Sequence, residues 1–210
     1  MFAEAETQGL IDESPEASID STGLESSFVS RHFLIRQGKR TQQYRKWTKL
    51  TVVCHHRSHL IAGALVSIGP SNDNSYLPAA VRQAVQHLRI DRLLADAGYD
   101  AETNHKLCRE DLGIRSTVIP VNDRNTKTGK TAGRYRKQMK RSFPKRKFRQ
   151  RWQVESVFSR MKRRLGYALR AHQEESRAIE CEFRVLTYNL MILYLLFKKS
   201  LSINKIMLEN

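Results

Sequence analysis

The chain has 210 residues, enough for one domain with its own core. Its 37 Lys and Arg against 21 Asp and Glu give a net charge of +16, which favours a polyanionic partner, nucleic acid before a membrane surface. Three distant cysteines fit a reducing cytosol and argue against a disulfide framework. No signal-peptide pattern opens the chain, and its most apolar run, Phe183–Phe197, is shorter than the roughly 20 residues of a membrane span. We therefore expect a cytoplasmic protein with no membrane partner.

The N-terminal part of the chain changes character at about residue 16. Residues 1–16 are acidic and show no clear periodicity, so we expect a poorly ordered lead-in. Ala17–Ser26 then predicts a short strand that contains Asp20 between small or apolar neighbours. Aspartate is depleted in strands, so Asp20 has either a functional role or a turn role before the Ser-Thr-Gly that follows it.

Two strands are predicted next, Thr48–His56 and Leu60–Ile68, with a hairpin turn at residues 57–59. A possible zinc cluster lies around this turn: Cys54, His55, His56 and His59. Neighbouring strand residues point to opposite faces, and no second ligand pair occurs at zinc spacing. We therefore discount zinc here.

Helices and strands alternate from Tyr76 onward. An amphipathic helix is predicted over Tyr76–Leu88 and a further helix over Ala101–Leu112. Between them, Arg92–Asp96 is a short apolar run that ends in an acid just before Gly, where α/β sheets commonly carry function. Ser116–Val121 predicts a last strand, at the edge of the sheet because of Pro120.

The remaining chain is dominated by basic residues. Asn122–Tyr135 predicts a mobile basic loop, and its Gly-Lys-Thr is not a P-loop because Arg124 stands where that motif needs Gly. Helices are predicted over Phe148–Lys162 and, as a core helix, over Arg177–Phe197. Between Arg124 and Arg170 there are 18 Lys and Arg and a single acid, Glu155.

Glu155 shares a narrow stripe of its helix with cations. At about 100° per residue from Glu155, Phe148 falls at about +20°, Arg151 at about −40° and Lys162 at about −20°. Val154, Phe158, Met161 and Leu165 form an apolar stripe beside it. Glu155 is then either the partner of Arg151 in an i,i+4 ion pair or a metal ligand beside a phosphate-binding surface.

The predicted elements suggest a mixed sheet flanked by helices, an α/β fold. If the strands of Asp20 and Asp96 are neighbours and the helix of Glu155 crosses them, three carboxylates meet at one end of the sheet. Such a set suits two divalent ions about 3.5–4 Å apart, and hard oxygen ligands favour magnesium.

These motifs together resemble the catalytic domain of insertion-sequence transposases of the DDE superfamily. IDSTG at Ile19–Gly23 and ADAGYD at Ala95–Asp100 resemble the family's two Asp-bearing strands. The helix signature Tyr-x2-Arg-x3-Glu-x6-Lys is met by Phe148, Arg151, Glu155 and Lys162, with Phe in place of Tyr and so without the phenol hydroxyl. The resemblance implies an RNase H-like catalytic domain at residues 17–197, with a basic loop before the Glu-bearing helix and a tail at 198–210.

The resemblance also implies roles for particular residues. Asp20, Asp96 and Glu155 become the catalytic metal ligands, for two Mg²⁺ or Mn²⁺ ions. The implied DNA contacts are Arg151, Lys162, Phe148 and the basic run Lys145, Arg146 and Lys147. Relatives commonly carry an N-terminal DNA-binding region, and only 19 residues precede Asp20, so we expect most of that region to be missing.

The expected function is metal-dependent hydrolysis at transposon ends followed by strand transfer to target DNA, by a homodimer. Two alternatives stay open: an RNase H-like nuclease without strand transfer, and an inactive DNA-binding transposase remnant. Tyr99 and Trp152 either stack on bases or pack inside the protein.

Overall fold

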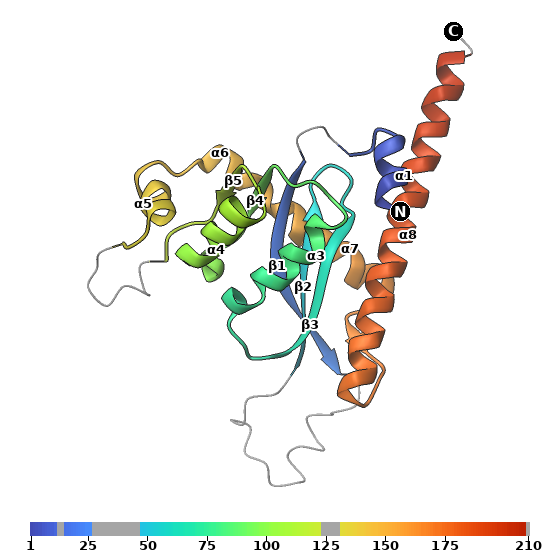
Figure 1. The fold of residues 1–210 in the computed structure, drawn as a ribbon. Helices are drawn as coiled ribbons and strands as arrows, with labels where there is room; N and C mark the ends of the chain where they lie inside the picture. The colour runs from blue at the N-terminus through green and yellow to red at the C-terminus, as the bar shows by residue number, and fades with distance from the viewer. Residues whose placement is uncertain (12–14, 27–46, 123–130, 209–210) are drawn as a thin grey trace.

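A mixed β-sheet forms the centre of the molecule (Figure 1). The computed structural model describes residues 1–11, 15–26, 47–122 and 131–208, with side chains up to residue 198. Within these ranges the sheet has six strands, in the order β3-β2-β1-β4-β5, with β6 attached to β1. The strands are β1 (Glu16–Ser26), β2 (Trp47–His55), β3 (Ile61–Gly69), β4 (Arg92–Leu94), β5 (Ser116–Val118) and β6 (Ala168–Leu169).

The central strand β1 has an antiparallel neighbour on one side and a parallel neighbour on the other. It pairs with β2 so that Asp20 lies opposite Val52, and with β4 so that Ser18 lies opposite Leu94. The strand that carries Asp20 and the strand that leads to Asp96 are thus neighbours, as expected. Asp96 lies close enough to Asp20 for its charge to raise the pKa of Asp20.

Helices cover both faces of the sheet, as the α/β prediction requires (Figure 1). They are α1 (Phe2–Thr7), α3 (Leu77–Val85), α4 (Glu102–Lys106), α5 (Arg134–Arg141), α6 (Lys145–Phe148), α7 (Trp152–Leu165) and α8 (Glu174–Leu208). Ala17 and Ile19 of β1 pack in one core with α3, whereas Leu24 packs in the other with α7 and α8. Because strand side chains alternate, Asp20 and Thr22 share the face that α7 covers.

Several local predictions are confirmed. The β2–β3 connection is a tight hairpin turn in which His59 adopts a φ of 61°. The helix expected over 101–112 begins as α4 and continues as a π-helical turn, Leu107–Asp111, before Gly113 at a φ of 68°. β5 lies at the sheet edge, as Pro120 indicated.

Three segments differ from the prediction. The acidic lead-in forms α1, because Ala5 is fully buried against the core of α7 and α8. The basic loop expected over Asn122–Tyr135 ends early, because Arg134 and Tyr135 already belong to α5. The contacts that hold α5 in place come from residues far earlier in the chain. The tail continues α8 to Leu208, in a stretch without Gly or Pro. Most of the predicted basic loop, residues 123–130, lies outside the described residues.

The long helix α8 is only partly a core helix. Tyr188 and Ile192 are buried against the sheet, while Phe183, Leu190 and Tyr194 are more than half exposed. The helix runs along the molecule and extends beyond it at the C-terminal end (Figure 1). Among the described residues, none of the helices has the length and apolar character that crossing a membrane requires. The three cysteines are buried and free, at positions that the structure describes.

Candidate active site

Asp20 lies in the middle of β1, partly buried on the face covered by α7. The backbone N–H of Ser21 donates to its Oδ1 at 2.8 Å. Burial raises the pKa of Asp20 and outweighs the hydrogen bond from Ser21 and the charge of Arg151, which lower it; the nearby carboxylate of Asp96 raises it further. The carboxylate therefore stands in surroundings where an added cation would stabilise its charged form.

Asp96 comes two residues after the end of β4 and caps a 3-10 turn, Ala97–Tyr99. Its Oδ1 accepts a hydrogen bond of 2.7 Å from the N–H of Gly98. A Cβ on Gly98 would lie 2.9 Å from that oxygen, so the tight turn needs glycine. The turn holds Asp96 at the carboxyl end of β4, the position that was predicted from the sequence.

Glu155 is exposed near the start of α7 and is joined to Asp20 by one guanidinium. Nη1 of Arg151 lies 2.8 Å from Asp20 Oδ2, and Nη2 lies 2.6 Å from Glu155 Oε1. The i,i+4 ion pair weighed from the sequence is thus present, but the same side chain also reaches the central strand. The width of a single guanidinium separates the two carboxylates.

Lys162 closes the other end of the same stripe. Its Nζ donates to Thr22 Oγ1 at 2.7 Å and to the carbonyl of Gly23 at 3.0 Å. Arg151, just before α7, and Lys162, within it, therefore both contact β1 about three helical turns apart. Arg151, Glu155 and Lys162 thus share one side of the helix as predicted, while Phe148 ends a separate helix, α6 (Lys145–Phe148), before a 3-10 turn at Arg149–Arg151. The roles of these residues stay predictions.

The remaining candidate DNA contacts lie just before α7. Phe148 packs against Phe143, with ring centroids 5.1 Å apart, and its ring lies 6.0 Å from the Arg151 guanidinium. The other three are on α6 and exposed: Lys145, Arg146 and Lys147.

The two aromatic candidates for base stacking differ. Tyr99 is fully buried, and its hydroxyl shares a 2.9 Å hydrogen bond with Ser21 Oγ, so it packs inside the protein and does not present its ring to a base. Trp152 is half exposed at the start of α7.

Sequence reasoning missed a second charged pair beside the site. Asp73 lies next to Asp96, because a Cβ on Gly98 would contact the carboxylates of both residues. Lys49 on β2 is buried, with its Nζ 2.6 Å from Asp73 Oδ1 and 2.7 Å from the carbonyl of Ser71. In the sequence, this pair could have been suspected only from Lys49, a charged residue within the otherwise apolar stretch 48–54.

The carboxylates suit a divalent cation by the chemistry of their donors. Asp20, Asp96 and Glu155 offer hard oxygen ligands from three adjoining elements. Within the described part of the chain no three His, Cys, Asp or Glu side chains gather as a ready metal-binding group, and Arg151 stands between two of the three carboxylates. The donor set fits a metal ion provided that Arg151 gives up at least one of its contacts.

Comparison with protein families gives a match over most of the chain. The model of the transposase DDE domain matches residues 13–190, a range that includes Asp20, Asp96, Glu155 and the two cations of the stripe. A comparison with curated proteins finds no match.

Proposed function

The chain belongs to the transposase DDE domain family, and from this premise we propose that it cuts DNA at transposon ends and joins the freed ends to target DNA. The family and the six-stranded mixed sheet of the described residues together confirm the RNase H-like α/β fold. Transposase function in general follows from the family. The subgroup with the Tyr-Arg-Glu-Lys signature stays part of the proposal.

The observation that supports the proposal is the bridge that Arg151 makes between Asp20 and Glu155. Asp96 follows the parallel neighbour of β1 by two residues and lies close enough for its charge to act on Asp20. Members of the family generally use divalent metals, and in this chain these three residues would hold them. Two bound Mg²⁺ or Mn²⁺ ions would activate the attacking oxygen and stabilise the leaving oxygen of a phosphodiester.

Arg151 and Lys162 bind the DNA strand in this proposal. They flank Glu155 on α7, so backbone phosphates that lie along β1 meet one cation on each side of the carboxylates. When a phosphate approaches, the Arg151 guanidinium exchanges its two carboxylate partners for phosphate oxygens, which it can bind with both Nη groups. The exposed run on α6, Lys145–Lys147, extends this basic track away from the site.

We further propose that the chain acts as a homodimer through α8. The exposed apolar residues of this helix recur at spacings of three and four: Ile179, Phe183, Leu186, Leu190 and Tyr194. That spacing forms a continuous seam which a second copy of the same helix would cover. Light scattering should give a dimer for the parent protein and a monomer for Phe183→Glu/Leu190→Glu. A parent protein that is monomeric at high concentration would contradict this arrangement.

A joining assay tests the proposed reaction. A labelled oligonucleotide that ends in the transposon 3′-OH is incubated with supercoiled target DNA and Mg²⁺. We expect covalent joining by the parent protein, none by Asp96→Asn, and normal joining by Glu182→Gln, which removes an exposed carboxylate on α8. Cleavage without any joining would instead identify a nuclease on the same fold, and salt-sensitive binding with neither reaction would identify an inactive remnant.

A further inference from the structure

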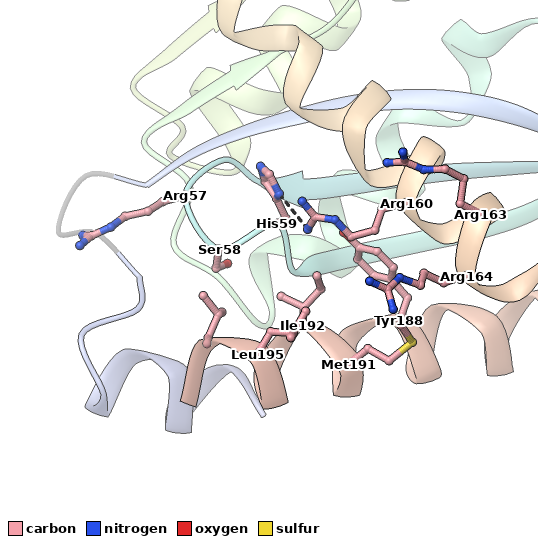
Figure 2. Close-up of a pocket in the computed structure, with 11 residues that line it drawn as sticks. Arg57, Ser58, His59, Arg160, Arg163, Arg164, Tyr188, Met191, Ile192 and Leu195 are labelled. Carbon is pink, nitrogen blue, oxygen red and sulfur yellow. Dashed lines mark hydrogen bonds between the residues drawn. The ribbon is translucent and has the colours of Figure 1, made fainter. Parts of the chain in front are cut away.

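A second basic surface lies on α7, on a different side of the helix from Arg151 and Lys162. A cavity of about 570 Å³ opens between the β2–β3 turn, α7 and α8, with Arg160, Arg163 and Arg164 along its rim (Figure 2). Measured from Glu155 at about 100° per residue, these arginines fall between about +80° and 180°. They therefore lie 80° or more around the helix from Glu155, on the side that faces the β2–β3 turn and α8.

The lining of the cavity combines cations with an apolar wall. Besides the three arginines of α7, Arg57 from the turn lies at its margin and points away from the others in Figure 2. The wall comes from α8, through Met191 and Ile192 among others. None of the described residues that line the cavity is acidic. This chemistry selects an anion that also carries an apolar or aromatic part.

The buried hydroxyl of Tyr188 also faces this cavity and lacks a hydrogen-bond acceptor among the described residues. Tyr188 is fully buried and lines the cavity, and its hydroxyl makes no regular hydrogen bond with the described residues. Burial raises the pKa of Tyr188 to about 12, although the nearby Arg160 guanidinium lowers it. Even where Arg160 donates to the phenol oxygen, the O–H still needs an acceptor, and a buried donor left unsatisfied costs about 1–3 kcal/mol.

Arg160 is held in place by the hairpin turn. His59 Nε2 lies 2.5 Å from Gln153 Oε1. Its Nδ1 lies 3.2 Å from Arg160 Nη1 (Figure 2). Since the Gln oxygen only accepts, Nε2 carries the proton and Nδ1 accepts from the arginine. Burial lowers the pKa of His59, and the Arg160 charge lowers it further, against the effect of the Gln153 hydrogen bond, so this neutral form persists. His59 therefore orients Arg160 at the cavity, beside Tyr188.

We propose that this cavity binds one nucleotide unit of a DNA strand outside the segment held at the catalytic carboxylates. The phosphate lies between Arg160, Arg163 and Arg164 and accepts from the Tyr188 hydroxyl, and the sugar and base pack on the wall from α8. The volume is that of a site for one small organic group, and guanidinium forks match phosphate oxygens. The inference rests on the proposed function in one respect, that the ligand is DNA. It does not depend on cleavage or joining.

Binding of a short fluorescent single strand tests the proposal. Arg163 and Arg164 are exposed, so Arg163→Gln/Arg164→Gln should fold normally. The matched control is Arg82→Gln/Arg89→Gln, which removes two exposed cations beside α3, on the opposite face of the sheet. We expect the cavity variant to weaken binding about ten-fold or more and to reduce the salt dependence by about two charges, with little change in the control. Equal weakening by both variants would overturn the proposal.

Photo-crosslinking locates the strand directly. A strand with 5-iododeoxyuridine should crosslink to peptides of α8 near Tyr188 and Met191, and Arg163→Gln/Arg164→Gln should lose that crosslink. Tyr188→Phe keeps the packing, removes the hydroxyl, and should weaken binding several-fold. Crosslinks confined to other elements, or tighter occupancy of the cavity by polyglutamate than by the strand, would overturn the proposal.

The same experiments in a Glu155→Gln background separate this inference from the proposed function. Binding and crosslinking at the cavity should persist in that background, whether or not the parent protein cuts or joins DNA. A parent protein that cuts DNA but shows no cavity crosslink would overturn the second site alone.

Discussion

Arg151, the residue just before α7, and Asp20 on β1 are 131 residues apart in the sequence, and their side chains are joined by a hydrogen bond of 2.8 Å. The same guanidinium also binds Glu155 at 2.6 Å. It therefore supplies a positive charge to Asp20 beside the carboxylate of Asp96. In the proposed site, a divalent ion would compete with Arg151 for the same carboxylate oxygens.

The competition predicts tighter metal binding once the arginine is removed. Arg151→Gln should bind Mn²⁺ more strongly than the parent protein in the absence of DNA, because a unit charge about 4 Å away contributes about 1 kcal/mol or more. Isothermal calorimetry measures the affinity, with the exposed Arg149→Gln as the control. Equal affinities in all three proteins would show that Arg151 does not oppose the metal.

A buried ion pair fixes α5 to the turn after β4. Arg136 donates to Asp100 through Nε and Nη2 at 2.7–3.0 Å, and the Asp100 side chain is fully buried. Arg136→Met should lower the free energy of unfolding by about 3–5 kcal/mol, because it leaves a buried carboxylate without its cation. Urea denaturation measures this, and Lys137→Met on the exposed side of α5 should stay near the parent value.

Glu102 caps α5 from a distance and makes its stability depend on pH. It accepts from the backbone N–H groups of Tyr135 and Arg136 at 3.1 and 3.0 Å. Burial raises the pKa of Glu102, but the backbone N–H groups, including that of Arg134, outweigh this and hold it below its usual 4.5. The stabilisation is therefore present above the unfolded-state pKa and is lost as the pH falls through the lower folded-state pKa.

Glu102→Gln should then be less stable than the parent protein at neutral pH, and the difference should shrink below about pH 4.5. Thermal unfolding followed across that range measures it. A difference that stays constant down to pH 3 would contradict the capping role.

Asn189 ties α8 to the start of the edge strand β3. Its Oδ1 accepts from the N–H of Ile61 at 2.8 Å, and its Nδ2 donates to the carbonyl of Ile61 at 2.9 Å. Asn189→Leu leaves two buried backbone groups unpaired, so it should cost about 2–4 kcal/mol of unfolding free energy. Chemical denaturation is the measurement, and a loss below about 0.5 kcal/mol would mean that water replaces the amide.

The sequence predicted the elements that carry the site better than those that connect them. Asp20 and Asp96 were recognisable because acids are rare in short apolar strands, and Glu155 because it stands alone among cations. Helix α5 was missed, since Asp100 and Glu102, which anchor it, lie more than 30 residues earlier in the chain. Asp73 was missed because its loop shows ordinary turn chemistry, and only the fold brings it beside Asp96.

Metal-dependent cleavage tests the central claim, that Asp20, Asp96 and Glu155 form one catalytic centre. DNA bearing the flanking element's own terminal repeats is incubated with the protein and Mg²⁺ or Mn²⁺, and nicks are mapped at single-nucleotide resolution. We predict nicking at the 3′ transposon ends that requires the metal and disappears in Asp20→Asn, Asp96→Asn and Glu155→Gln, while DNA binding persists. Full cleavage by any of these three variants would contradict the assignment.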